Sequence, residues 1–148
     1  PLAAYEVRNA FKLYLNDIGM LRSVAGVSTE SLALDRDFPF KGRFVENFVL
    51  QQLAGQVEGA VHYYAERADR EIDFVLQHDS VAVPVEVKAG ESKKAASFKT
   101  FVNARHPRYA IRFSERNLKQ DGAFVNIPLY LVSRFWNCLP RPVLASRT

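Results

Sequence analysis

A single cysteine, Cys138, leaves the 148-residue chain without an internal disulfide bond and fits a reducing, cytoplasmic compartment. The three histidines lack metal-ligand spacing and have no cysteine partners, which argues against a zinc site. We find no Ser-His-Asp motif and no G-x-x-x-x-G-K-S/T phosphate loop, so ATP hydrolysis by that loop is not expected. No apolar run approaches the ~20 residues that cross a bilayer, and no signal peptide is visible.

The composition is that of a globular protein, with 48% hydrophobic and 24% charged residues. The length corresponds to one domain, residues 1–148, which can bury roughly two-thirds of its unfolded surface. No internal repeat or low-complexity segment interrupts it. Because the chain begins at Pro1 and not at a methionine, we expect it to be a fragment of a longer protein.

Positive charge is concentrated in one segment. The whole chain carries +4, whereas Lys88 to Lys119 contains nine lysines and arginines against two glutamates, or +7. A basic segment of this kind suits a phosphate backbone and predicts nucleic-acid contacts, for which the candidate residues are Lys93, Lys94 and Lys99. A solvated helix face with salt bridges to the acidic remainder explains the same charges equally well.

The stretch from Arg70 to Gly90 is typical of a β-hairpin. Apolar residues alternate on both strands (Ile72, Phe74 and Leu76, then Val81, Val83, Val85 and Val87), with turn-forming residues between them. Because side chains of a strand alternate between its faces, we expect Asp73, Glu86 and Lys88 to converge on one polar face.

Two carboxylates and a lysine in this arrangement are typical of metal-assisted phosphodiester hydrolysis. Carboxylate oxygens hold Mg²⁺, and the ion generates hydroxide and clamps a reacting oxygen. A nearby lysine stabilises charge on the phosphate or orients the water. A solvated hairpin face with a Glu–Lys pair remains the alternative interpretation of Asp73, Glu86 and Lys88.

The clearest predicted helix runs from Gly42 to Ala54, with an apolar stripe that packs on a sheet. Glu46 lies at the border of that stripe, where an acid is costly unless it is paired or binds a cation. It is therefore a candidate further metal or water ligand. The alternative is a solvated acid near the helix N-terminus, where the dipole favours it.

The remaining elements are shorter. We predict a helix from Lys93 to Ala104 capped by Ser92 and a closing helix over Leu129 to Asn137, together with short helical turns near the N-terminus and strands at Lys12 to Asn16, Ala60 to Ala65, Arg108 to Phe113 and Ala123 to Ile127. A hairpin followed by a crossover helix indicates a mixed sheet flanked by helices, in the α/β class.

Six pieces of the chain carry a resemblance to a known family: KLYLNDIGML (Lys12 to Leu21), GRFVENFVLQQL (Gly42 to Leu53), EIDFVL (Glu71 to Leu76), PVEVKAG (Pro84 to Gly90), YAIRFS (Tyr109 to Ser114) and NIPLYLV (Asn126 to Val132). In order and coverage they resemble the C-terminal domain of prokaryotic AAA-type ATPases, a domain of unknown function with a restriction-endonuclease-like fold. The wider group it resembles is the PD-(D/E)-x-K nuclease superfamily, although Ile72 stands where many members have proline before Asp73.

The resemblance implies a function and a site. The metal ligands for Mg²⁺ or Mn²⁺ would be Asp73 and Glu86, with Glu46 as the helix acid, and Lys88 would be the catalytic lysine of an endo- or exonuclease acting on DNA. The upstream part of the full-length protein would be an ATPase module.

Two other functions are compatible with the same residues. A catalytically inactive module binding DNA or a partner protein would regulate the ATPase, because a fold does not imply a function. In that case a network closed by Lys88 and an arginine would leave no vacancy for a cation. An oligomerisation unit with an exposed apolar patch is a third, weaker hypothesis, and the sequence does not determine the oligomeric state.

Overall fold

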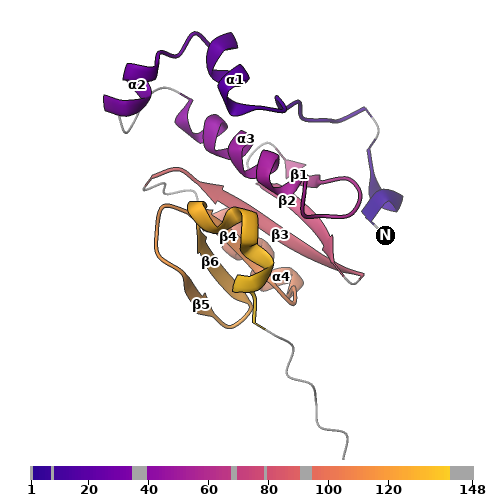
Figure 1. Cartoon of the computed structure of the whole chain (residues 1–148). Helices are drawn as coiled ribbons and strands as arrows, with labels where there is room; N and C mark the ends of the chain where they lie inside the picture. The colour runs from indigo at the N-terminus through magenta and orange to yellow at the C-terminus, as the bar shows by residue number, and fades with distance from the viewer. Residues whose placement is uncertain are drawn as a thin grey trace, which may run out of the picture.

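The computed structural model describes residues 2–7, 9–34, 40–67, 70–78, 80–90 and 95–140 (Figure 1). Its centre is a six-stranded sheet in the order β1-β2-β3-β4-β6-β5. The strands are β1 (His62–Arg67), β2 (Arg70–His78), β3 (Val81–Lys88), β4 (Ala110–Ser114), β5 (Lys119–Asp121) and β6 (Phe124–Pro128). The predicted α/β class with a mixed sheet flanked by helices is confirmed.

The sheet changes from antiparallel to parallel at β3. Strands β1, β2 and β3 form an antiparallel meander, as the hairpin pattern predicts. Helix α4 (Ala95–Arg105) then crosses over, and β4 lies parallel to β3, with Glu86 beside Arg112 in the register. Strand β6 lies parallel to β4, and the short β5, which the sequence did not reveal, pairs antiparallel at the edge.

Helices cover both faces of the sheet. On one face, α3 (Lys41–Leu53) and the 3-10 helix η2 (Leu129–Cys138) pack over the larger core cluster, which includes Val49, Val85, Phe113, Ile127 and Phe135. On the other face, α4 contributes Phe98 to a smaller cluster with Ile72, Val75 and Ala110 (Figure 1). This helix packs on the sheet through Phe98, whereas its predicted cap, Ser92, lies outside the described residues.

The N-terminal segment contains three short helices: η1 (Leu2–Tyr5), α1 (Ile18–Val24) and α2 (Thr29–Leu34). Asp17 caps α1, and its side chain accepts a hydrogen bond from the Met20 N–H at 2.9 Å. Helix α1 lies beside α3, on the side of α3 away from the sheet (Figure 1). Within the described ranges, no helix has the length and apolarity to cross a membrane.

The predicted strand from Lys12 to Asn16 is wrong. These residues form no ladder, because the backbone of Leu15 is bonded to a side chain instead. The Asn47 amide of α3 accepts from the Leu15 N–H and donates to the Leu15 carbonyl, both at 2.9 Å. The buried Asn47 side chain thus makes the two hydrogen bonds that a neighbouring strand would make with Leu15. The periodicity of the sequence does not reveal such a partner.

One further prediction needs correction. The alternation of Ile72, Phe74 and Leu76 breaks, because Asp73 and Phe74 together lie opposite Tyr63 of β1 in a bulge, and Ile72 packs in a different cluster from Phe74. The predicted closing helix over Leu129 to Asn137 is confirmed, as a 3-10 helix with non-helical backbone angles at Arg134.

Candidate functional site

Glu86 is the most deeply buried acid of the predicted site, with 4% of its surface exposed. It lies on β3 between Val85 and Val87, which face the cluster under α3, so its side chain points to the opposite face of the sheet. One carboxylate oxygen, Oε1, lies 2.7 Å from Lys88 Nζ. The other, Oε2, accepts from Arg112 Nε at 3.1 Å and from Arg112 Nη2 at 2.9 Å.

Arg112 is held by the neighbouring strands. The parallel pairing of β3 with β4 places it directly beside Glu86. Its guanidinium also lies over the ring of Phe124, 5.0 Å from the ring centre. The Glu86 carboxylate is therefore enclosed by two cations, one from its own strand and one from the next.

Asp73 lies where β2 and β3 stop pairing. The ladder between them ends at the pair of Phe74 and Val85, and beyond it Asp73 Oδ2 accepts from the Val87 N–H at 2.7 Å. Because of the bulge at Asp73 and Phe74, the Asp73 carboxylate takes the place of the backbone carbonyl that would otherwise accept from the Val87 N–H. Asp73 thus has a structural role at the end of the hairpin.

The pKa of Asp73 is raised from its ordinary value of 3.8 to about 6. Burial is the largest cause, because it disfavours the charged form, and the negative charge of Glu46 acts in the same direction. The Val87 N–H and the charges of Lys12 and Lys88 oppose the shift. Such a shift in a buried carboxylate is common at functional sites and also occurs in structural networks.

Glu46 is buried on α3 and is also enclosed by partners. Its Oε1 accepts from Lys12 Nζ at 3.2 Å and forms a short hydrogen bond with the Tyr14 hydroxyl, and its Oε2 lies 3.2 Å from Arg43 Nη1. Burial raises the pKa of Tyr14, and the bond to Glu46 raises it further. Tyr14 therefore stays a neutral donor.

Lys12 connects this acid to the sheet. It also pairs with Glu71 of β2, and its ammonium lies 5.1 Å from the centre of the Tyr63 ring. Burial lowers the pKa of Lys12, but its bonds to Glu71 and Glu46 outweigh that effect, so the pKa is raised. Glu46 thus anchors the N-terminal segment on α3, together with the neighbouring Asn47.

The structure brings the predicted site residues together in two groups and not in one. Glu86 and Lys88 form a group with Arg112, whereas Glu46 belongs to the helix on the opposite face, and Asp73 lies within electrostatic reach of both. Among the described residues, no three His, Cys, Asp or Glu side chains are placed to hold a metal ion. The nearby acids instead meet four cations (Lys12, Arg43, Lys88 and Arg112).

This donor set does not fit Mg²⁺ or Mn²⁺ as arranged. Such ions bind carboxylate oxygens directly and keep several water molecules. Both oxygens of Glu86, and both oxygens of Glu46, are bonded to protein cations or a hydroxyl. A divalent ion at Glu86 would have to displace Arg112 or Lys88. The lysines and arginines neutralise the buried acids, and the Asp73 carboxylate holds the end of the hairpin.

Of the three lysines predicted to contact nucleic acid, only Lys99 lies among the described residues. Lys99 is exposed on α4, the helix that covers the Glu86 side of the sheet. Lys93 and Lys94 lie outside the described residues. The other basic residues of the segment include Lys88 and Arg112, which pair with Glu86 and so do not present free positive charge to a phosphate.

Sequence analysis did not find the partners that decide the character of the site. Arg112, Lys12, Tyr14 and Arg43 lie 26, 34, 32 and 3 residues from the acids that they contact. One pattern could have indicated Arg112: a charged residue between Ile111 and Phe113 in a buried strand requires a counter-charge. Nothing in the local sequence indicated that Lys12 and Tyr14 reach α3.

Comparison with known proteins gives one match. No curated protein and no solved structure matches the chain. A family model described as a domain of unknown function (DUF4143) matches residues 41–132, which begin with α3 and end in η2. This match spans more than half of the chain and contains Glu46, Asp73, Glu86, Lys88 and Arg112. The chain therefore belongs to the DUF4143 family of domains of unknown function.

Proposed function

We propose that this domain is a non-catalytic protein-binding module of a larger AAA-type ATPase. The observation that carries the proposal is the closure of Glu86, whose two oxygens are bonded to Lys88 on one side and to Arg112 on the other. The acid and the lysine that resemble a nuclease site thereby stabilise the junction of β3 with β4. The resemblance to ATPase C-terminal domains supplies the setting of the proposal.

Protein binding is favoured over DNA binding by the described surface. Among the described residues nine large hydrophobic side chains are exposed, and seven of them lie before Lys41: Tyr5, Val7, Phe11, Leu13, Met20, Val24 and Phe40. Where such side chains lie together they mark a surface for another protein. The lysines and arginines around the predicted site are paired with acids, which weakens their attraction for a phosphate backbone.

The proposal is tested by Mn²⁺ titration calorimetry with wild-type protein, an Arg112→Met variant and a control, Arg134→Met. Wild-type protein is expected to bind no Mn²⁺, because Arg112 occupies Glu86. Arg112→Met keeps an apolar chain over Phe124 and frees Glu86 Oε2, so weak Mn²⁺ binding should appear. Arg134 is exposed in η2, which packs on the face of the sheet opposite Glu86, and its loss should change nothing.

A metal-dependent nuclease acting on DNA is the second candidate, and the raised pKa of Asp73 favours it. The same proteins, with Lys88→Ala, should be incubated with supercoiled plasmid and single-stranded DNA in Mn²⁺, with and without chelator. The non-catalytic module leaves both substrates intact. Cleavage by wild-type protein that stops in Lys88→Ala and with chelator would overturn the proposal in favour of the nuclease.

A further inference from the structure

An apolar pocket lies between α1, α3 and the start of η2, on the outer side of α3. Its volume is about 300 Å³, which is the lower end of the range for ligand pockets. The residues that line it are Ile18, Gly19, Arg22, Lys41, Phe44, Val45, Phe48 and Leu129. None of them belongs to the two charged groups described above, so this pocket is separate from the nuclease-like site.

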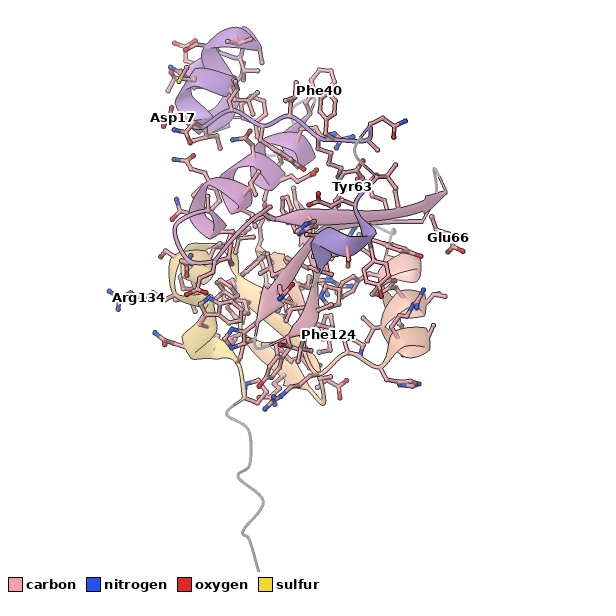
Figure 2. The ribbon with its side chains drawn as sticks, turned by 90° about the vertical axis from the view of Figure 1, so that its right-hand side faces the viewer. Asp17, Phe40, Tyr63, Glu66, Phe124 and Arg134 are labelled. Atoms are coloured by element: carbon pink, nitrogen blue, oxygen red, sulfur yellow. The ribbon has the colours of Figure 1, made fainter. Side chains whose placement is uncertain are left out.

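Exposed apolar side chains border the pocket. Met20, Phe40 and Tyr130 are 57%, 74% and 76% exposed, and each is the chain neighbour of a lining residue. Phe40 also has a φ of 68°, a left-handed backbone conformation that is strained for a bulky residue. Figure 2 shows Phe40 at the same end of the molecule as Asp17, the residue that caps α1. Three exposed apolar side chains thus adjoin lining residues of the pocket along the chain.

The charges at the pocket define its partner. Its lining contains two cations, Arg22 and Lys41, and no acid. Lys41 is paired with the exposed Glu115 at 2.9 Å, whereas Arg22 donates to the neutral hydroxyl of Thr29. The charge of Arg22 is therefore not compensated by an acid among the described residues. A carboxylate beside an apolar anchor would complement it.

We propose that this pocket binds a segment of a partner protein in which a large apolar side chain stands next to an acidic residue. The apolar side chain enters between α1 and α3, and the acid pairs with Arg22. This inference rests on the proposed protein-binding function and names its surface and the chemistry of its partner.

A second copy of the chain fits the pocket less well than such a partner. Its exposed Phe11 and Leu13 flank Lys12, which is already paired with Glu46 and Glu71, so they bring no acid toward Arg22. Glu6, beside two other exposed apolar residues, is already bonded to His62 at 2.8 Å. Neither stretch therefore supplies a free carboxylate to pair with Arg22.

The test uses a matched pair of short peptides, one with alternating leucine and glutamate residues and one with lysine in place of glutamate. Each is titrated into the ¹⁵N-labelled full chain in buffer with chelator, and amide shifts are recorded. The glutamate peptide should shift Gly19, Val45 and Phe48 and bind about fivefold more tightly than the lysine peptide, as a partly exposed ion pair allows. Arg22→Glu should reverse this preference.

Two further variants distinguish binding in the pocket from nonspecific binding elsewhere on the surface. Val45→Gln adds a polar group inside the pocket and should abolish the shifts, whereas Val24→Gln, on α1 but outside the lining, should not. Equal binding of both peptides, unchanged preference in Arg22→Glu, or shifts that depend only on protein concentration would overturn the proposal. These outcomes do not depend on the Mn²⁺ experiment, because the chelator removes metal from the peptide titration. DNA cleavage would contradict the non-catalytic function. It would not contradict peptide binding in the pocket if that binding shows the expected charge selectivity.

Discussion

The N-terminal segment (2–34, with Phe40) and the sheet body (41–140) are held in place by different interactions. All buried hydrophobic residues among those described lie in the body, between Phe44 and Phe135, and the described part of the segment has none. The segment is bonded to α3 through Glu46, Asn47 and Gln51, and Tyr14 packs against the edge of the core. Burial of apolar area therefore stabilises the body, and a few hydrogen bonds place a mostly exposed segment on top of it.

This difference explains the position of the charged site. Glu46 is buried because it lies where the segment meets α3, and its partners Lys12 and Tyr14 come from the segment. Glu86 is buried within the body and finds its partners there. The family match covers only the body, from residue 41 to 132, so the segment that neutralises Glu46 lies outside it.

The largest difference in the free energy of unfolding should come from replacing one phenylalanine in the body and one in the segment. Phe113 is fully buried and packs edge-on against Phe135, with 5.8 Å between the ring centres. Phe113→Ala should lower the free energy of unfolding by about 3–5 kcal/mol. Phe11→Ala, which removes a residue that is 71% exposed, should stay within about 0.5 kcal/mol. Urea denaturation measures both, and similar losses would show that the segment has an apolar core of its own.

Asp73→Asn should stabilise the protein at high pH. The folded state raises the pKa of Asp73 from 3.8 to about 6, so it binds the proton more tightly than the unfolded state does. Stability therefore falls as the pH rises between these two values, by roughly 3 kcal/mol once both are passed. The asparagine variant lacks this loss and can still accept from the Val87 N–H.

Urea denaturation at pH 4 and pH 8 checks this prediction. The advantage of Asp73→Asn over wild-type protein should grow by about 2.5 kcal/mol from the lower to the higher pH, because pH 4 already lies slightly above 3.8. Asp121→Asn, at an exposed position on β5, is the matched control. An advantage that is the same at both pH values would show that Asp73 does not carry a raised pKa.

The smallest effect should come from detaching the segment without unfolding the body. Asn47→Ala removes both bonds to the Leu15 backbone and should cost about 1–3 kcal/mol, most of it local to the segment. Hydrogen exchange should then accelerate at Leu15 and Ile18 and stay slow in β3 and β4. Asn103→Ala, at an exposed position on α4, is the control. Faster exchange throughout the sheet would mean that segment and body unfold as one unit.

Much of the body was predictable from local patterns. The helix of Gly42 to Ala54 and the hairpin of Arg70 to Gly90 agree with the structure within one or two residues, since their apolar periods match it except at the bulge of Asp73 and Phe74. In the N-terminal segment the predicted short helical turns are confirmed. The strand predicted at Lys12 to Asn16 is wrong, because the conformation there depends on side chains of α3 that are 32 or more residues away. Strand β5 is exposed throughout and carries no apolar pattern that would predict it.

The class of fold and the candidate acids follow from local patterns, because periodicities of 2 and 3.6 residues decide which side chains face the core. What those acids do depends on tertiary contacts. Parallel pairing of β3 with β4 placed Arg112 beside Glu86, and docking of the N-terminal segment placed Lys12 and Tyr14 on Glu46. The same Asp73, Glu86 and Lys88 can hold a cation or form ion pairs, and the choice depends on the neighbours that distant parts of the chain supply.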